Sequence, residues 1–124
     1  MPKKHEYKIL LNWYISLETI KQVDRFVKIN TIGNRNKFFV KVIQAIVNGI
    51  INPEKLKSQN TEESKLFHFN LYISANLVQK FYKLNFYSSD ANKAVETILR
   101  NPNLWKKVKK AGEDEKKIKK KIKK

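Results

Sequence analysis

Two asparagines carry the side chains in this sequence that are best suited to recognising a nucleobase. Asn12 and Asn70 each present an amide that matches the N6 and N7 edge of adenine. Each asparagine lies in a short alternating segment, so residues two positions away share its face. Those neighbours are Leu10, Tyr14, His68 and Tyr72. Leucine can contact a thymine methyl, and tyrosine and histidine can donate to a base or a phosphate.

Each of these side chains also has an ordinary structural interpretation. The asparagines and His68 could be solvated surface residues, and the tyrosines could pack beside a neighbour on the same sheet face. The N-terminal segment could cover Leu10. Trp13 is expected in the core because it shares a strand face with the apolar residues Leu11 and Ile15, opposite the face of Asn12.

No catalytic constellation is evident in the sequence. His5 and His68 are too few and too scattered for a nucleophilic triad or a His-rich metal site, and there is no Cys. The acidic runs at 62–63 and 113–115 lie in polar stretches, and no Gly-rich phosphate loop is present. We therefore predict no enzyme activity, no metal and no cofactor.

Charge is the strongest compositional signal. The 124 residues, about the size of one domain, include 27 Lys and Arg against 11 Asp and Glu, a net charge of +16. Residues 101–124 alone contain 11 basic and 3 acidic groups. This excess favours a polyanionic partner such as nucleic acid. No apolar run approaches the roughly 18 residues of a membrane span, and we expect a cytoplasmic protein without a membrane partner.

The elements that would position these residues occur twice. Alternating segments at 7–15 and 67–73 predict strands, and each is followed by a serine N-cap, a helical pattern, a polar turn and a second helical pattern. An offset of 58 aligns Asn12, Tyr14, Ile15 and Ser16 with identical residues in the second copy. Asn34 or Asn36 is expected to cap the second helix of the first copy, and Ser89 or Asp90 that of the second.

The repeat predicts a mainly α fold with a two-stranded antiparallel β-ribbon. Residues 7–51 form the first strand-helix-helix repeat, 52–65 a linker and 66–101 the second repeat. Residues 102–124 form a Lys-rich C-terminal tail that is expected to be partly helical. One ribbon face must pack on the helices, and the residues expected there are Leu11, Trp13, Ile15, Phe69, Leu71 and Ile73.

This pattern resembles the ribbon-helix-helix transcription regulators of the Arc and MetJ type. The resemblance rests on residues 69–74 with Leu77 and Val78, and on residues 15–47 with the Gly33 turn; it covers about 7–50 and 66–100. The tandem layout with a basic tail is similar to that of a regulator from archaeal filamentous viruses, which would place the protein in the host cell. The family normally pairs two chains, so the resemblance implies a pseudo-dimer formed by the two repeats within one chain.

The resemblance also implies a division of DNA contacts. The family inserts its ribbon into the major groove, which implies base reading by the six residues Leu10, Asn12, Tyr14, His68, Asn70 and Tyr72. Helix N-termini after the turns would contact phosphates. The positions implied there are Asn34, Arg35, Asn36, Lys37, Ser88, Ser89 and Asn92. Leu10 departs from the polar reader that is usual in the family, and Asp90 places a negative charge beside the expected phosphate contacts.

Three functional hypotheses follow. The first is a sequence-specific double-stranded DNA-binding transcription regulator. The second is an antitoxin-like DNA-binding module whose tail or second repeat binds a protein partner. The third is a nonspecific nucleic-acid or membrane-surface binder driven by lysine charge. A single ribbon reads only a few base pairs, so we also expect a homo-oligomer or cooperative assembly on DNA. Leu104, Trp105 and Val108 could supply the apolar surface for it, or could instead dock one helical turn onto the chain with Trp105 as the anchor.

Overall fold

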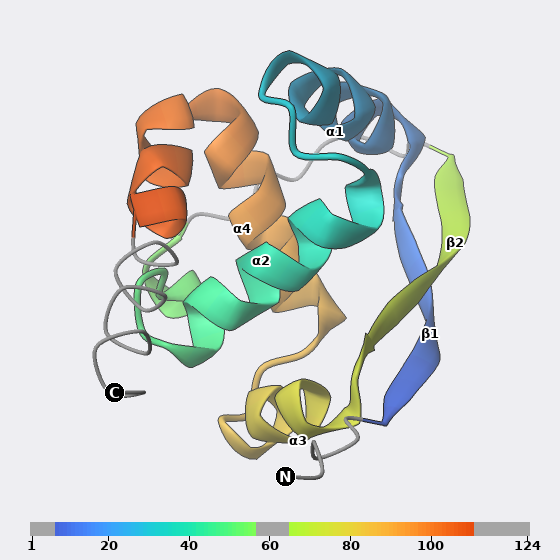
Figure 1. The fold of residues 1–124 in the computed structure, drawn as a ribbon, viewed down its shortest axis with the longest axis vertical. Coiled ribbons are helices and arrows are strands. Elements are labelled where there is room, and N and C mark those ends of the chain that lie inside the picture. The colour runs from blue at the N-terminus through green and yellow to red at the C-terminus, as the bar shows by residue number, and fades with distance from the viewer. Residues whose placement is uncertain (1–6, 57–64, 111–124) are drawn as a thin grey trace, which may run out of the picture.

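The computed structural model describes residues 7–56 and 65–110, in which helices pack on one face of a two-stranded sheet (Figure 1). The first half contains β1 (Lys8–Ser16), α1 (Leu17–Ile29) and α2 (Arg35–Val47). The short 3-10 helix η1 (Pro53–Lys55) follows. The second half contains β2 (Leu66–Ser74), α3 (Ala75–Lys83) and α4 (Ser88–Arg100). The predicted mainly helical fold with a two-stranded antiparallel sheet is confirmed.

The two strands pair along their full length to form the ribbon. Asn12 lies opposite Asn70 at the centre, and Lys8 lies opposite Ser74 at one end. Backbone hydrogen bonds extend the pairing at both ends, from Ala75 N–H to the Tyr7 carbonyl (2.7 Å) and from Leu17 N–H to the Lys65 carbonyl (2.8 Å). These two bonds join positions related by the same 58-residue offset as the sequence repeat.

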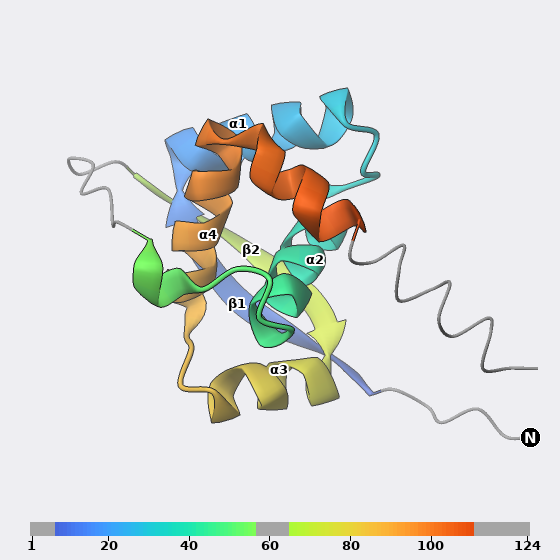
Figure 2. The same ribbon diagram turned by 90° about the vertical axis from the view of Figure 1, so that its left-hand side faces the viewer.

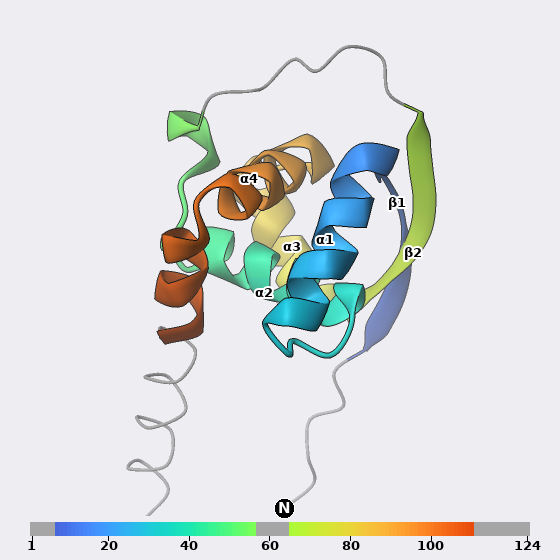
Figure 3. The ribbon, with the colours of Figure 1, turned by 90° about the horizontal axis from the view of Figure 1, so that it is seen from above.

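The two faces of the ribbon differ as the alternation predicts. Trp13, Ile15, Leu71 and Ile73 are at most 2% exposed, because the helices cover this face (Figure 3). Leu11 and Phe69 pack against the edge of the same core and are half-buried. The other face of the ribbon carries no helix of the described residues.

α2 and α4 cover the middle of the inward ribbon face, and α1 and α3 lie at the two ends of the ribbon (Figure 2). Apolar side chains cover more than one side of α2, so this helix packs against the ribbon, α3 and α4. Its fully buried side chains include Phe38, Phe39, Val42 and Ile43. α4 contributes Ala91, Ala94, Val95 and Ile98 to the same core.

Three of the predicted helix starts are confirmed. Ser16 Oγ accepts from Thr19 N–H (3.4 Å), and Ser74 Oγ accepts from Leu77 N–H (3.5 Å). Asn34 Oδ1 accepts from Lys37 N–H (2.9 Å) and so caps α2.

The predicted cap of α4 is wrong. This helix begins at Ser88 with Tyr87 at the cap position, so Ser89 and Asp90 both lie within its first turn. The Asp90 carboxylate instead reaches back and accepts from Tyr87 N–H (2.7 Å). An acidic side chain in the first turn stabilises the helix as well through the helix dipole.

The linker and the tail both begin with ordered, core-forming segments. Pro53 of the linker is buried, as is Ile51 just before it, although the linker is polar in sequence. Residues 102–110 are helical, and Trp105 packs its ring against Phe26 and Phe38 at centroid distances of 5.8 and 5.2 Å. Residues 57–64 of the linker and 111–124 of the tail lie outside the described residues.

The burial of Trp105 corrects one expectation. Trp105 and Val108 are 5% and 6% exposed, and Leu104 packs against the same core. These residues dock the helical segment 102–110 onto the chain itself. They therefore do not supply an apolar surface for association with other copies.

Candidate nucleic-acid interface

The six candidate base-reading residues share the outward ribbon face. All six are exposed, and Leu10, Tyr14 and Tyr72 show 63%, 53% and 50% of their surface. Their order on the face follows from the strand register, which pairs Asn12 with Asn70, Leu10 with Tyr72, and Tyr14 with His68. The face is therefore an exposed ladder of three cross-strand pairs with two amides at its centre.

One half of this outward face is internally connected. His68 Nε2 lies 3.2 Å from Asn12 Oδ1, within hydrogen-bonding distance. The His68 ring also stacks in a tilted arrangement on Tyr14, with the centroids 4.9 Å apart. These contacts hold the Asn12 amide in a defined orientation.

The other half is arranged differently. Lys8 Nζ lies 5.4 Å from the centroid of the Tyr72 ring, in a cation–π contact. Here Leu10 lies opposite Tyr72, whereas at the other end of the outward face Tyr14 lies opposite His68. At this end of the face, Asn70 is therefore followed by the Leu10 and Tyr72 pair, with Lys8 over the Tyr72 ring.

The candidate phosphate-contacting residues of α2 have well-defined partners. The Asn36 amide binds the outer edge of β2, donating to the Tyr72 carbonyl (2.8 Å) and accepting from Tyr72 N–H (2.7 Å). Lys37 is exposed one residue later, and its aliphatic chain lies against Gly33, whose φ of +113° suits a glycine. Asn36 thus fixes the start of α2 beside the ribbon, while Lys37 remains accessible.

Arg35 is held by an ion pair rather than extended into solvent. Its guanidinium donates to both carboxylate oxygens of Asp24, from Nε at 3.0 Å and from Nη2 at 2.6 Å. The same group stacks over Phe67 and Phe69 at 4.9 and 5.7 Å. The Asp24 carboxylate therefore partly neutralises the charge that Arg35 contributes to this surface.

The α4 side repeats the Asn36 contact with one change. Asn92 donates to the Tyr14 carbonyl (2.9 Å), but its oxygen accepts from the Trp13 indole N–H (2.8 Å). The corresponding residue of the second strand is Leu71, which has no side-chain donor. Ser88 and Ser89 are exposed in the first turn of α4, beside Asp90.

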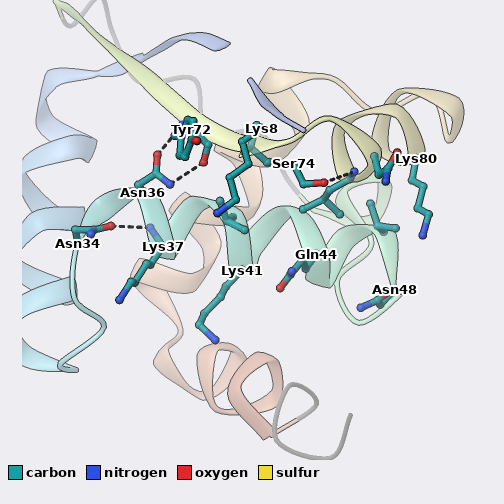
Figure 4. Close-up of a pocket in the computed structure, with 15 residues that line it drawn as sticks. Lys8, Asn34, Asn36, Lys37, Lys41, Gln44, Asn48, Tyr72, Ser74 and Lys80 are labelled. Carbon is teal, nitrogen blue, oxygen red and sulfur yellow. Dashed lines mark hydrogen bonds between the residues drawn. The ribbon is translucent and has the colours of Figure 1, made fainter. Parts of the chain in front are cut away.

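A basic groove, which sequence analysis missed, opens between α2, α3 and the adjoining end of the ribbon (Figure 4). Its volume is about 900 Å³, and no acidic residue lines it. We call it the α2–α3 groove and define it by its four lysines, Lys8, Lys37, Lys41 and Lys80. The spacing of Lys37 and Lys41 places both on one face of α2, but nothing in the sequence predicts that Lys8 and Lys80 lie near them.

One carboxyl group of α4 has a shifted pKa. Burial raises the pKa of Glu96 on α4 above its usual value, and the positive charge of Arg100 opposes that rise. The Glu96 carboxyl is therefore partly desolvated and interacts electrostatically with Arg100 on the same helix.

The described residues contain no cluster of His, Asp and Glu side chains that could hold a metal ion. Of the helices in 7–56 and 65–110, none is both long and apolar enough to cross a membrane. Comparison of the chain with protein-family models, curated proteins and solved structures finds no match.

Proposed function

We propose that the protein is a sequence-specific double-stranded DNA-binding transcription regulator that inserts its ribbon into the major groove. In this proposal the two repeats act as a ribbon-helix-helix pseudo-dimer within one chain. The major groove of B-DNA, about 12 Å wide, accommodates a two-stranded ribbon. The net charge of +16 favours a polyanionic partner.

The observation that carries this proposal is the central pair Asn12 and Asn70. The two amides lie directly opposite each other on the exposed ribbon face. If this face were buried, apolar residues would be needed at positions 12 and 70. If it were only exposed to solvent, nothing would require two identical amides opposite each other at its centre. Bidentate contact with adenine uses an exposed amide of this kind.

Phosphate contacts would flank the ribbon in this proposal. Lys37 stands in the first turn of α2, where the helix dipole and free backbone N–H groups also favour an anion. Asn36 and Asn92 already bind the ribbon backbone. We therefore assign them the role of holding the N-termini of α2 and α4 at the correct distance from the duplex, with Asn34, Ser88 and Ser89 nearer to solvent.

The proposal is tested by selecting a preferred duplex from a random library and comparing it with a scrambled duplex. Asn12→Ala and Asn70→Ala should each cost about 1–3 kcal/mol on the preferred duplex and lower the discrimination. Asn103→Ala, at an exposed position remote from the ribbon, serves as the control. Equal affinity of the unaltered protein for both duplexes at two salt concentrations would refute sequence-specific reading.

Deletion of residues 113–124 separates specific from nonspecific binding. The deletion removes 7 lysines and 3 acidic residues. Because tail lysines would act through counterion release, affinity should fall similarly for both duplexes, and the salt dependence should become shallower. Loss of discrimination on tail deletion, with discrimination retained in the two asparagine variants, would assign the reading to the tail instead.

We also propose that copies associate on DNA, because one ribbon contacts too few base pairs for useful specificity. Binding to duplexes with one or two preferred sites, followed by sedimentation velocity, measures this. Cooperative occupation is expected. Strictly independent one-to-one binding contradicts it.

A further inference from the structure

The α2–α3 groove differs in charge from the equivalent place in the other half of the molecule. Two contacts define the equivalence: Asn36 binds the Tyr72 backbone as Asn92 binds that of Tyr14, and Ser74 caps α3 as Ser16 caps α1. Offsets of 56 between α2 and α4 and 58 between α1 and α3 follow from these anchors. The positions around the groove can therefore be matched one by one.

The lysines of the groove have few counterparts. Lys8 corresponds to Leu66 and Lys80 to Gln22, both without charge. Lys41 corresponds to Thr97, whose hydroxyl donates to the Lys93 carbonyl (2.8 Å). Of the four lysines only Lys37 has a basic match, which is Lys93.

Acidic residues occur at the matched positions on α1 and α4 but not in the groove. Asn34, Val40 and Asn76 of the groove correspond to Asp90, Glu96 and Glu18. Arg100 replaces Gln44 and offsets one of these charges. The groove thus has four positive charges and no negative charge, whereas at the matched positions three acidic residues outnumber the two basic residues, Lys93 and Arg100.

The outward ribbon face also differs between the two halves of the molecule. Leu10 and His68 occupy equivalent places, so an apolar residue in one half matches a hydrogen-bonding ring in the other. His68 contacts Asn12, whereas Leu10 has no polar side-chain atom with which to contact Asn70. The two central amides therefore have different surroundings.

We infer that the α2–α3 groove binds the phosphate backbone of the DNA and that the protein binds a non-palindromic site in one orientation. This inference rests on the proposed DNA-binding function. The groove adjoins the ribbon end at Lys8 and Tyr72, so a strand leaving the ribbon would pass Lys37 and enter it toward Lys41 and Lys80 (Figure 4). On the opposite side a backbone would meet Glu18, Asp90 and Glu96, which repel phosphate.

Hydroxyl-radical footprinting with a salt titration tests the inference on the full chain and its preferred duplex. The unaltered protein should protect the backbone farther on one flank of the core site than on the other. The double variant Lys41→Gln with Lys80→Gln should lose that extra protection and lower the slope of log affinity against log salt by about 1.8. At moderate salt its affinity should fall by roughly tenfold or more.

Two further variants keep the test specific. Lys28→Gln with Lys83→Gln removes the same charge from exposed helix positions outside the groove, and the asymmetric protection should remain. Adding Gln22→Lys and Thr97→Lys to the groove double variant transfers both lysines to the matched side. The two flanks should then be protected to similar extents, because the groove keeps only Lys8 and Lys37 while the matched side gains two positive charges.

The outcomes distinguish this inference from the proposed function. Symmetric protection by the unaltered protein, or an unchanged footprint in the Lys41 and Lys80 double variant, overturns the groove inference while specific binding stands. If the unaltered protein does not prefer any duplex, the proposed function itself fails. Thermal unfolding of each variant verifies that the changes in binding do not come from loss of fold.

Discussion

Asn36 binds the backbone of Tyr72 through both ends of its amide, at 2.8 and 2.7 Å, and so pairs with the outer edge of β2 as a third strand would. This contact links the first turn of α2 to the ribbon across 36 residues of sequence. It also occupies donor and acceptor groups that an edge strand otherwise leaves open. The Asn36 side chain therefore fixes the first turn of α2 against the edge of the ribbon.

Replacement of Asn36 by alanine should lower the free energy of unfolding by about 1–2 kcal/mol, since two hydrogen bonds at a partly exposed site are lost. Urea denaturation measures the change. Asn103→Ala is the matched control and should alter stability by less than about 0.5 kcal/mol. Equal midpoints for the two variants would show that the amide does not hold the helix to the ribbon.

Leu71→Asp should destabilise the fold by several kcal/mol or prevent folding, because it places a charge where the native side chain is 0% exposed. Leu66→Asp provides a control on the same strand, since Leu66 is 69% exposed. Circular dichroism and thermal unfolding compare the two. Similar thermal midpoints would contradict the assignment of the inward ribbon face.

Asp24→Asn should increase DNA affinity several-fold at low salt, because it removes the carboxylate that neutralises Arg35. The free energy of unfolding should change by less than about 1 kcal/mol, since both partners of the ion pair are partly exposed. Fluorescence anisotropy with a labelled duplex measures the affinity. If Glu54→Gln, with the same change in net charge, increases affinity equally, Arg35 has no specific contact.

Glu96→Gln should stabilise the protein near pH 7 and have little effect near pH 3. Burial raises the pKa of this carboxyl in the folded state, so the native protein binds the proton more tightly than the unfolded chain. The stabilisation from protonated Glu96 is complete below the unfolded pKa of about 4.3 and is lost as pH rises through the folded pKa. The difference between the thermal midpoints of the variant and the unaltered protein should therefore increase between these pH values. A difference independent of pH would contradict burial as the cause.

Local sequence patterns determined the secondary structure and the faces of the ribbon. Alternation placed Trp13 and Leu71 inward and Asn12 and Asn70 outward, since successive strand residues point to opposite faces. Ser16 and Ser74 mark helix starts because their hydroxyls accept from N–H groups only three residues away. Each of these interactions spans a few residues, so the sequence alone contains the necessary information.

Contacts between distant segments were decided only by the tertiary structure. Asn36 and Asn92 share with Lys37 the phosphate-contacting role that the sequence implies, but in the folded chain their amides bind the ribbon backbone. The burial of Trp105 depends on the packing of Phe26 and Phe38, which no local pattern specifies. The α2–α3 groove likewise requires β1, α2 and α3 to meet, because lysines from three separate elements become neighbours only when the chain folds.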